Sequence, residues 1–151
     1  MFDSILVVCV GNICRSPTGE RLLKNNLPGK KISSAGIAAL EGEPADSMAT
    51  IVALENGLSL EGHLARQITS AMCHSSDLIL VMETAQINVV CRVAPEVRGK
   101  IMLFGHWNGK KDIVDPYRKS REAYEFVYRL LEESALQWSV ALSNSLSREN
   151  P

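Results

Sequence analysis

The sequence lacks the patterns that identify membrane-spanning, repeat and nucleic-acid-binding proteins. No apolar run reaches the roughly 18 residues that a membrane-spanning helix needs, and neither an internal repeat nor a low-complexity block is present. The net charge is −1, so no broad basic face for nucleic acid or an anionic membrane is expected. These absences favour a soluble globular protein with no nucleic-acid partner and no membrane insertion.

Cysteine is sparse and widely spaced. The four cysteines, at positions 9, 14, 73 and 91, contain no C-x2-C pair, so the sequence predicts no zinc site and no other metal site. The chain starts directly with a predicted strand, without the charged segment and long apolar segment of a secretion signal, so no secretion is expected. Free thiols then predict a reducing, cytoplasmic location.

The order of apolar and amphipathic segments predicts one α/β domain. A chain of 151 residues has the length of a single domain and should bury about 68 to 70% of its unfolded surface. We expect a four-stranded parallel sheet with helices on both faces, a three-layer Rossmann-like fold. The expected strands are 4–10, 31–35, 78–82 and 100–103, and the expected helices are 17–27, 46–55, 84–93 and 119–142. The domain should span 1–146 with a polar tail at 147–151, and the chain should fray from 143.

The last predicted helix carries apolar residues at spacings of three and four, which predicts one buried stripe. The expected stripe is Ala123, Val127, Leu130, Ser134, Trp138 and Ala141. Phe126, Leu131 and Trp138 could alternatively form a recognition surface. Large apolar residues on a helical stripe are more often core, so we assign all three to the core.

The most specific pattern is Cys-Val-Gly-Asn-Ile-Cys-Arg-Ser at Cys9 to Ser16, between an apolar strand and a helix that begins at Pro17. A thiol is a good nucleophile at neutral pH when positive charge or a helix N-terminus stabilises its thiolate. This loop can supply both, because its backbone N–H groups can curl around one point and the helix directs its positive end there. Cys9 is therefore the candidate nucleophile.

The same loop can hold a phosphate. Gly11 permits a tight turn, Asn12 tolerates a left-handed backbone, and the planar fork of Arg15 matches two phosphate oxygens. The expected phosphate-binding residues are Val10, Gly11, Asn12, Ile13, Cys14 and Arg15. Cys, Arg and Ser at these offsets should occur by chance in roughly one chain in a hundred, but the flanking strand and helix make the match specific. A buried structural cysteine, the simpler alternative, leaves Asn12 and Arg15 unexplained.

This motif resembles the signature of the low-molecular-weight protein tyrosine phosphatases. Asp115-Pro116-Tyr117, before the last predicted helix, is similar to the general-acid loop of that family, and the segments 34–36, 63–68 and 77–82 resemble family segments in the same order. The likeness covers nearly the whole chain and implies the phosphotyrosine phosphatase I-like fold. Segments 103–107 and 115–120 resemble most closely the bacterial members that act beside exopolysaccharide or capsule tyrosine kinases.

The resemblance implies a protein-tyrosine phosphatase, a cysteine-dependent hydrolase with a phosphocysteine intermediate. Cys9 would attack phosphorus, Arg15 would hold the phosphoryl oxygens, and Asp115 would act first as acid and then as base. Ser16 would donate its hydroxyl to the sulfur, and neither a metal nor a cofactor is expected. Simpler roles exist for two of these residues: Asp115 could only initiate a turn, and Ser16 could be the N-cap of the first helix.

The resemblance also assigns residues around the loop. Leu40 and Tyr117 are implied as walls of a substrate pocket deep enough to favour phosphotyrosine over phosphoserine. Ser34 and His63 are implied to brace Asn12 through hydrogen bonds, although a single histidine is more often an ordinary surface or core residue.

Two further hypotheses concern neighbouring side chains. A low-pKa, accessible Cys9 would be easily oxidised, and Cys14 could then trap it as a reversible disulfide; the simpler role of Cys14 is core packing. Arg118 and Lys119 would suit an acidic or multiply phosphorylated tyrosine segment.

The expected partner is a phosphotyrosine protein, namely an autophosphorylated tyrosine kinase that controls exopolysaccharide or capsule synthesis. A thioredoxin-coupled arsenate reductase on the same fold is one alternative, but it needs a close second cysteine pair, whereas Cys73 and Cys91 lie far apart and are expected to be inert. A non-catalytic phosphotyrosine-binding module is the other, and binding alone would need neither Cys9 nor Asp115.

Overall fold

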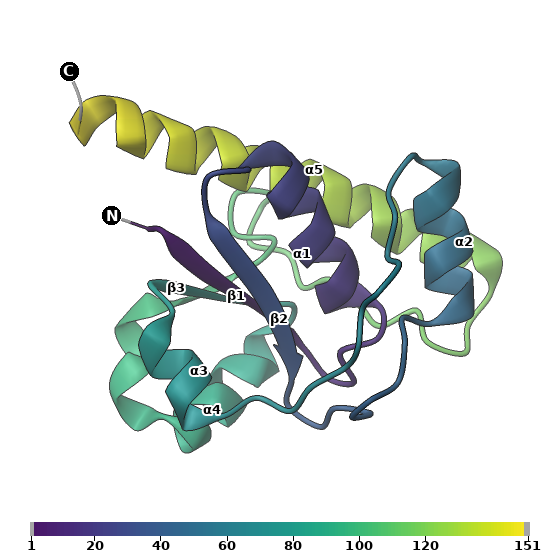
Figure 1. The fold of residues 1–151 in the computed structure, drawn as a ribbon, viewed down its shortest axis with the longest axis horizontal. Helices are drawn as coiled ribbons and strands as arrows, with labels where there is room; N and C mark the ends of the chain where they lie inside the picture. Colours follow the sequence, from purple (N-terminus) through teal and green to yellow (C-terminus); the bar gives the residue numbers. More distant parts are fainter. Residues whose placement is uncertain (1, 150–151) are drawn as a thin grey trace.

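The computed structural model describes residues 2–149, which form a parallel sheet between two layers of helices (Figure 1). The strands lie in the order β2-β1-β3-β4, and every neighbouring pair is parallel. Their bounds are Ser4–Cys9 for β1, Lys31–Gly36 for β2, Leu78–Val81 for β3 and Ile101–Leu103 for β4. The predicted four-stranded α/β fold is confirmed, and each strand ends within one residue of its predicted position.

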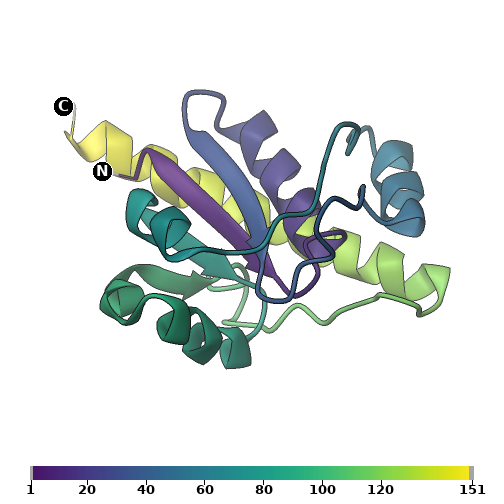
Figure 2. The same cartoon turned by 60° about the horizontal axis from the view of Figure 1, so that its bottom comes forward.

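Helices cover both faces of the sheet (Figure 2). One face packs against α1 (Arg15–Asn26) and α5 (Arg121–Glu149), and α2 (Ser47–Glu55) packs against α5 in the same core. The other packs against α3 (Ser70–Ser75), α4 (Thr84–Val93) and the 3-10 helix η1 (Pro95–Lys100). The sequence did not predict α3 or η1, because each has only six residues and is too short to show a helical period.

The central strand β1 is buried on both sides. Ile5 and Val7 belong to the core under α1 and α5, whereas Leu6 and Val8 belong to the core under α3 and α4. Successive side chains of a strand point to opposite faces, so a strand covered on both faces needs a continuous apolar run. This burial fixes the position of Cys9, the last residue of β1, at the carboxyl edge of the sheet.

The final helix is longer than predicted. It begins at Arg121, two residues late, and continues to Glu149, because no Gly or Pro interrupts this segment. The expected helix end at 142 and the fraying from 143 are therefore wrong for residues 143–149, and residues 150 and 151 lie outside the described part. No helix within residues 2–149 is both long enough and apolar enough to span a membrane.

The buried stripe of α5 is displaced from the predicted one. Its buried members are Tyr124, Val127, Tyr128, Leu131, Ser134, Ala135, Trp138, Ser139 and Leu142. The core assignment is confirmed for Leu131 and Trp138, but it is wrong for Phe126, which is 53% exposed. Phe126 precedes Leu131 by five residues, or about 140° around a helix, so the two cannot share one narrow face.

Candidate active site

The loop after β1 lies at the carboxyl edge of the sheet, beside the point where the chain changes from one side of β1 to the other. Ligands of open α/β sheets bind at such switch points. The segment that follows β4 returns to the same edge, where the Ile113 N–H donates to the Met82 carbonyl, 2.8 Å away. This contact brings Asp115, which is distant in sequence, to Cys9 at the end of β1.

Asn12 holds the loop in a strained conformation, with a φ of 58°. Its side-chain Nδ2 donates to Ser16 Oγ at 2.7 Å and to Ser34 Oγ at 3.0 Å, and its Oδ1 accepts from the Arg66 N–H at 2.9 Å. His63 Nε2 lies 2.6 Å from the Asn12 carbonyl oxygen. The structure thus brings Ser34 and His63 to Asn12, as the resemblance implied. It adds Arg66, which lies in the segment 63–68 but was assigned no role from the sequence.

The steric demand of the loop falls on Gly36 rather than on Gly11. A Cβ on Gly11 would meet only ordinary contacts, the nearest at 3.7 Å, and Gly11 has no left-handed φ. A Cβ on Gly36, at the end of β2, would lie 2.4 Å from the Val10 carbonyl oxygen. The tight-turn role expected of Gly11 is therefore wrong, because the close approach is between the loop backbone and the neighbouring strand.

Arg15 is fully buried, with 1% of its surface exposed, and is held by two other segments. Its Nη1 pairs with the Glu83 carboxylate and donates to the Ile113 carbonyl at 2.8 Å, and its Nη2 lies 3.7 Å from Asp115 Oδ2. Sequence reasoning missed Glu83. Its position just after β3, at the same sheet edge as the loop, was the available signal.

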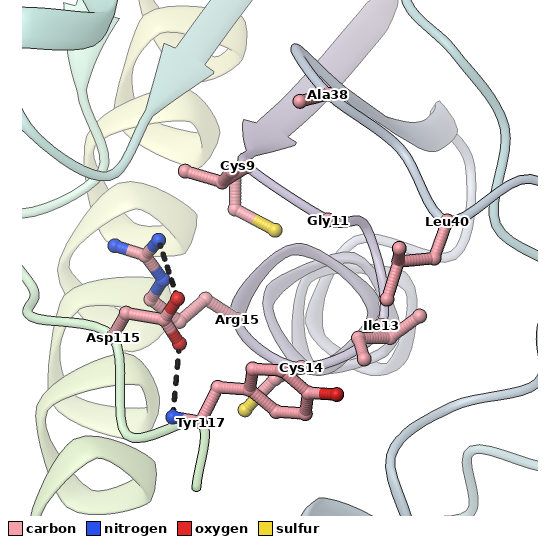
Figure 3. Close-up of a pocket in the computed structure, with 10 residues that line it drawn as sticks. Cys9, Gly11, Ile13, Cys14, Arg15, Ala38, Leu40, Asp115 and Tyr117 are labelled. Carbon is pink, nitrogen blue, oxygen red and sulfur yellow. Dashed lines mark hydrogen bonds and ion pairs between the residues drawn. The ribbon is translucent and has the colours of Figure 1, made fainter.

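The Asp115 carboxylate makes two contacts (Figure 3). Oδ1 accepts the Tyr117 backbone N–H at 3.0 Å, an Asx-turn contact, and Oδ2 is the oxygen nearest Arg15. Asp115 therefore initiates a turn, as the simpler alternative expected, and still directs its carboxylate to the loop. Its side chain is 43% exposed, so it can exchange protons with solvent.

A pocket of about 180 Å³ opens above the loop. In Figure 3 Cys9, Leu40 and Tyr117 lie on different sides of the pocket. Cys9 is buried, whereas Leu40 and Tyr117 are exposed. The lining residues are Cys9, Val10, Gly11, Ile13, Cys14, Arg15, Ala38, Leu40, Asp115 and Tyr117. Ala38 is the one lining residue that the sequence did not indicate, and Asn12 and Ser16 lie behind the lining.

Ser16 is not the cap of α1. The N-cap is Cys14, and no side chain caps this helix, so its first N–H groups stay available for an anion. The expected capping role of Ser16 is therefore wrong, because α1 starts one residue before it. Ser16 Oγ lies 2.9 Å from Cys9 Sγ, the contact that the hydroxyl role requires.

Cys14 lies in the same loop and is buried. Burial raises the pKa of its thiol well above the ordinary value, and the nearby Cys9, Asp46 and Asp115 raise it further. Cys14 therefore stays a neutral thiol at physiological pH.

The rim beside Tyr117 is basic. Arg118 has a left-handed φ of 62°, and its guanidinium lies 5.2 Å from the centre of the Tyr117 ring, a cation–π distance. Arg118 and Lys119 are both exposed. Within residues 2–149, no three His, Cys, Asp or Glu side chains are grouped so that they could hold a metal ion.

An open α/β sheet with a cysteine, an arginine and an aspartate around a backbone anion loop defines the class of cysteine-dependent phosphatases. The chain belongs to the low molecular weight phosphotyrosine protein phosphatase family, whose model matches residues 4–150. It is a protein-tyrosine phosphatase, and its substrates are phosphoproteins.

Three relatives illustrate the similarity. The low molecular weight protein-tyrosine-phosphatase Wzb of Escherichia coli K12 is 59% identical over 143 residues, which cover 95% of this chain and 97% of that protein. The crystal structure of the Erwinia amylovora tyrosine phosphatase AmsI is 60% identical, with a TM-score of 0.92 and 93% of each chain covered. Vibrio vulnificus Wzb in complex with benzylphosphonate is 55% identical, with a TM-score of 0.92, and the match covers 93% of this chain and 99% of that one.

Proposed function

We propose that this phosphatase cleaves phosphotyrosine in two displacement steps, with Cys9 as nucleophile. The observation that supports this best is that Cys9 and Arg15, at the two ends of the loop after β1, and Asp115, from the segment after β4, line one pocket. In the first step the Cys9 thiolate forms an S–P bond while the bond from phosphorus to the tyrosine oxygen breaks. Asp115 gives its proton to the departing phenolic oxygen, a transfer typically worth about 10² to 10⁴ in rate.

Arg15 and the loop N–H groups stabilise the charge that spreads over the three equatorial phosphoryl oxygens. The contacts of Arg15 with Glu83 and Ile113 support this role, because they use Nη1 and hold the guanidinium plane in one orientation. A planar, fixed fork is what bidentate recognition of two oxygens needs.

In the second step water attacks the phosphocysteine, and Asp115 accepts a proton from that water. The S–P bond breaks and Cys9 leaves as a thiolate. Ser16 then donates its hydroxyl to the sulfur, and the 2.9 Å distance between Ser16 Oγ and Cys9 Sγ supports this contact. Inorganic phosphate is the product.

Substrate choice depends on the depth and walls of the pocket. A phosphotyrosine can reach the buried Cys9 between Leu40 and Tyr117, whereas a phosphoserine is too short. The Vibrio vulnificus relative was solved in complex with benzylphosphonate, in which a methylene group joins the phosphonate to an aromatic ring, and this supports an aromatic phosphate as ligand here.

The physiological substrate we propose is an autophosphorylated bacterial tyrosine kinase that controls exopolysaccharide or capsule synthesis. The likeness of segments 103–107 and 115–120 to bacterial members that act beside such kinases supports it, and the exposed Arg118 and Lys119 suit an acidic, multiply phosphorylated segment. We infer that the enzyme works in the cytoplasm, where the free thiol of Cys9 stays reduced.

Phosphate release tests this function. Wild type, Cys9→Ser and Asp115→Asn are assayed with phosphotyrosine and phosphoserine peptides in the presence of EDTA. We expect wild type to cleave only phosphotyrosine, Cys9→Ser to be inactive, and Asp115→Asn to lose about 10²-fold or more in kcat. Binding of the phosphopeptide without cleavage would instead indicate a binding module, and neither binding nor cleavage would make arsenate with thioredoxin the next substrate to test.

A further inference from the structure

The segment that leads from β4 to Asp115 is tied to the segment after β3 by hydrogen bonds at two successive residues. The Ile113 N–H donates to the Met82 carbonyl at 2.8 Å. One residue earlier, Asp112 Oδ1 accepts two hydrogens from Thr84, one from its backbone N–H and one from its hydroxyl, each at 2.9 Å. A single carboxylate oxygen of Asp112 therefore joins the two segments.

The partner of Asp112 is a fixed end of a helix. Thr84 is the first residue of α4, so its N–H has no acceptor inside the helix. The Glu83 side chain, at the N-cap, accepts the N–H of Gln86 instead. Asp112 thus satisfies a different N–H of the same helix end, and its negative charge lies where the positive end of the helix dipole favours an anion.

The two segments that Asp112 joins both contact Arg15. Glu83, next to Thr84, pairs with Arg15 Nη1, and the Ile113 carbonyl accepts from the same nitrogen at 2.8 Å. Ile113 is buried in the core and uses both of its backbone groups, whereas Asp112 is exposed. The side chain of Asp112 is therefore the part of this anchor that a substitution can remove without opening the core.

The Asp115 carboxyl follows this anchor by three residues. Its Oδ1 accepts an N–H of its own turn, and its Oδ2 lies 3.7 Å from Arg15 Nη2, which is longer than a hydrogen bond. Asp115 is preceded by Val114, which is 50% exposed, and followed by the buried Pro116. On the β4 side, the anchor at Asp112 and its neighbour thus sets where the backbone of Asp115 lies.

We propose that Asp112 is a positioning residue, which holds the segment after β4 against α4 and so keeps the Asp115 carboxyl within reach of the departing oxygen. The proposal rests on the proposed role of Asp115 as general acid. Asp112 does not line the pocket and does not touch the substrate. A donor must come within about 2.6 to 3.2 Å of the oxygen that it protonates, so a small shift of the segment slows that transfer.

Two small substrates separate proton transfer from other effects. The phenolate that leaves phenyl phosphate is a strong base, like that of tyrosine, whereas p-nitrophenolate is a weaker base and needs less protonation to leave. The ratio kcat/KM reports binding and the first phosphoryl transfer. We expect Asp112→Ala to lower kcat/KM for phenyl phosphate about three- to tenfold, the effect of one hydrogen bond, and for p-nitrophenyl phosphate by about twofold at most.

The conservative variant Asp112→Asn tests the cause. Its amide keeps one oxygen, and both hydrogens from Thr84 go to one oxygen, so we expect kcat/KM for phenyl phosphate within about twofold of wild type. A loss as large as in Asp112→Ala would mean that charge at the end of α4 is the cause, and the inference would be wrong. The matched control is Asp3→Ala, which removes an exposed aspartate before β1 and should keep wild-type values.

A double-variant cycle tests whether Asp112 acts through Asp115. In an Asp115→Asn background there is no acid to position, so adding Asp112→Ala should leave kcat/KM for phenyl phosphate unchanged. Three results would overturn the inference: a further loss in that background, an equal loss on both substrates in Asp112→Ala, or no loss at all. Circular dichroism and thermal unfolding confirm that each variant is folded.

Failure of the proposed function gives a different result, in the single variant Asp115→Asn. If Asp115→Asn kept the wild-type kcat/KM for phenyl phosphate, Asp115 would not be the general acid. If Asp115→Asn lost activity but Asp112→Ala did not, only the positioning role would fall. The two failures are therefore distinguishable.

Discussion

At the scale of single residues, the site depends on side chains whose positions are set by partners outside the signature loop. Arg15 is buried and contacts Glu83, Ile113 and Asp115, from two other segments of the chain. A long flexible cation loses less conformational entropy on binding phosphate when it is already held. The contacts of Arg15 therefore predict a measurable effect for Glu83.

We expect Glu83→Gln to lower kcat/KM for a phosphotyrosine peptide by about 10- to 100-fold, because Arg15 loses a charged hydrogen-bond partner. Glutamine can still accept the backbone N–H that Glu83 accepts in the cap of α4, so the fold should persist. Steady-state kinetics measure the change, and Glu96→Gln on η1 is the control. Unchanged kcat/KM in Glu83→Gln would mean that Arg15 needs no such partner.

We propose that Cys14 protects an oxidised Cys9. The thiol of Cys14, kept protonated by its raised pKa, resists oxidation itself, and it can condense with a Cys9 sulfenic acid to give a disulfide and one water. After peroxide and then dithiothreitol, Cys14→Ser should recover a smaller fraction of its initial activity than wild type. Cys91→Ser is the control, and equal recovery in all three proteins would contradict a protective role.

At the scale of elements, a buried tyrosine of α5 makes the stability of the fold depend on pH in the alkaline range. Burial raises the pKa of Tyr128 to about 12, with Glu132 contributing. The unfolded chain releases this proton near pH 10, and the folded chain keeps it to about pH 12, so the free energy of unfolding falls as pH rises through that window.

Tyr128→Phe should make this alkaline decline shallower, by up to about 1.4 kcal/mol per pH unit. Urea unfolding between pH 9 and pH 11 measures the slope. Tyr117→Phe is the control, because its ring lies exposed at the pocket mouth. A slope that changes equally in both variants would show that the burial of Tyr128 is not the cause.

Asp77, which directly precedes β3, ties the beginning of β3 to the beginning of β1. Its Oδ2 accepts the backbone N–H groups of Asp3 at 2.9 Å and Ser4 at 3.1 Å. These bonds lower the pKa of Asp77, the one from Ser4 most. A lowered pKa stabilises the fold above the unfolded value of about 3.9, and the contribution is lost as pH falls through the folded value.

Asp77→Asn should therefore lower the free energy of unfolding at pH 7, and the difference from wild type should shrink at pH 3. Chemical unfolding at both pH values checks this, with Glu41→Gln as the exposed control. A deficit as large at pH 3 as at pH 7 would show that the negative charge of Asp77 is not what matters.

At the scale of the whole molecule, the pocket is the place where the segments that follow β1, β2 and β4 meet. Inorganic phosphate should bind the native state only, so it should raise the melting temperature. At ten times its Kd the expected gain is about 1.4 kcal/mol, or roughly 3 to 5 °C for a domain of this size. Differential scanning fluorimetry measures the shift.

The matched variant for the phosphate experiment is Arg15→Ala, in which we expect little or no shift because the charge clamp is gone. Lys31→Ala, an exposed cation at the start of β2, should keep the wild-type shift. An equal shift in Arg15→Ala would indicate that phosphate stabilises the protein at another place or through a general salt effect.

The sequence alone determined the features that depend on local order. Apolar strands alternating with helices required a parallel sheet with two covered faces, and the residues Cys9 to Ser16 required an anion loop between a strand and a helix. The parallel sheet and the position of this loop between β1 and α1 are confirmed, because each depends on neighbours in the chain, whereas anion binding by the loop stays a prediction. Short elements such as α3, and the exposure of Phe126, were not predictable in this way, since one turn shows no period and a helix face is chosen by what packs against it.

Only the tertiary structure decided which distant side chains complete the loop. Glu83 and Ile113 hold Arg15, and the Arg66 N–H fixes the amide oxygen of Asn12, although the sequence assigned none of these three residues a role at the loop. The parallel sheet brings the carboxyl ends of its strands to one edge, so segments far apart in sequence meet there. The sequence names the reactive groups, whereas the fold supplies the partners that fix their orientation.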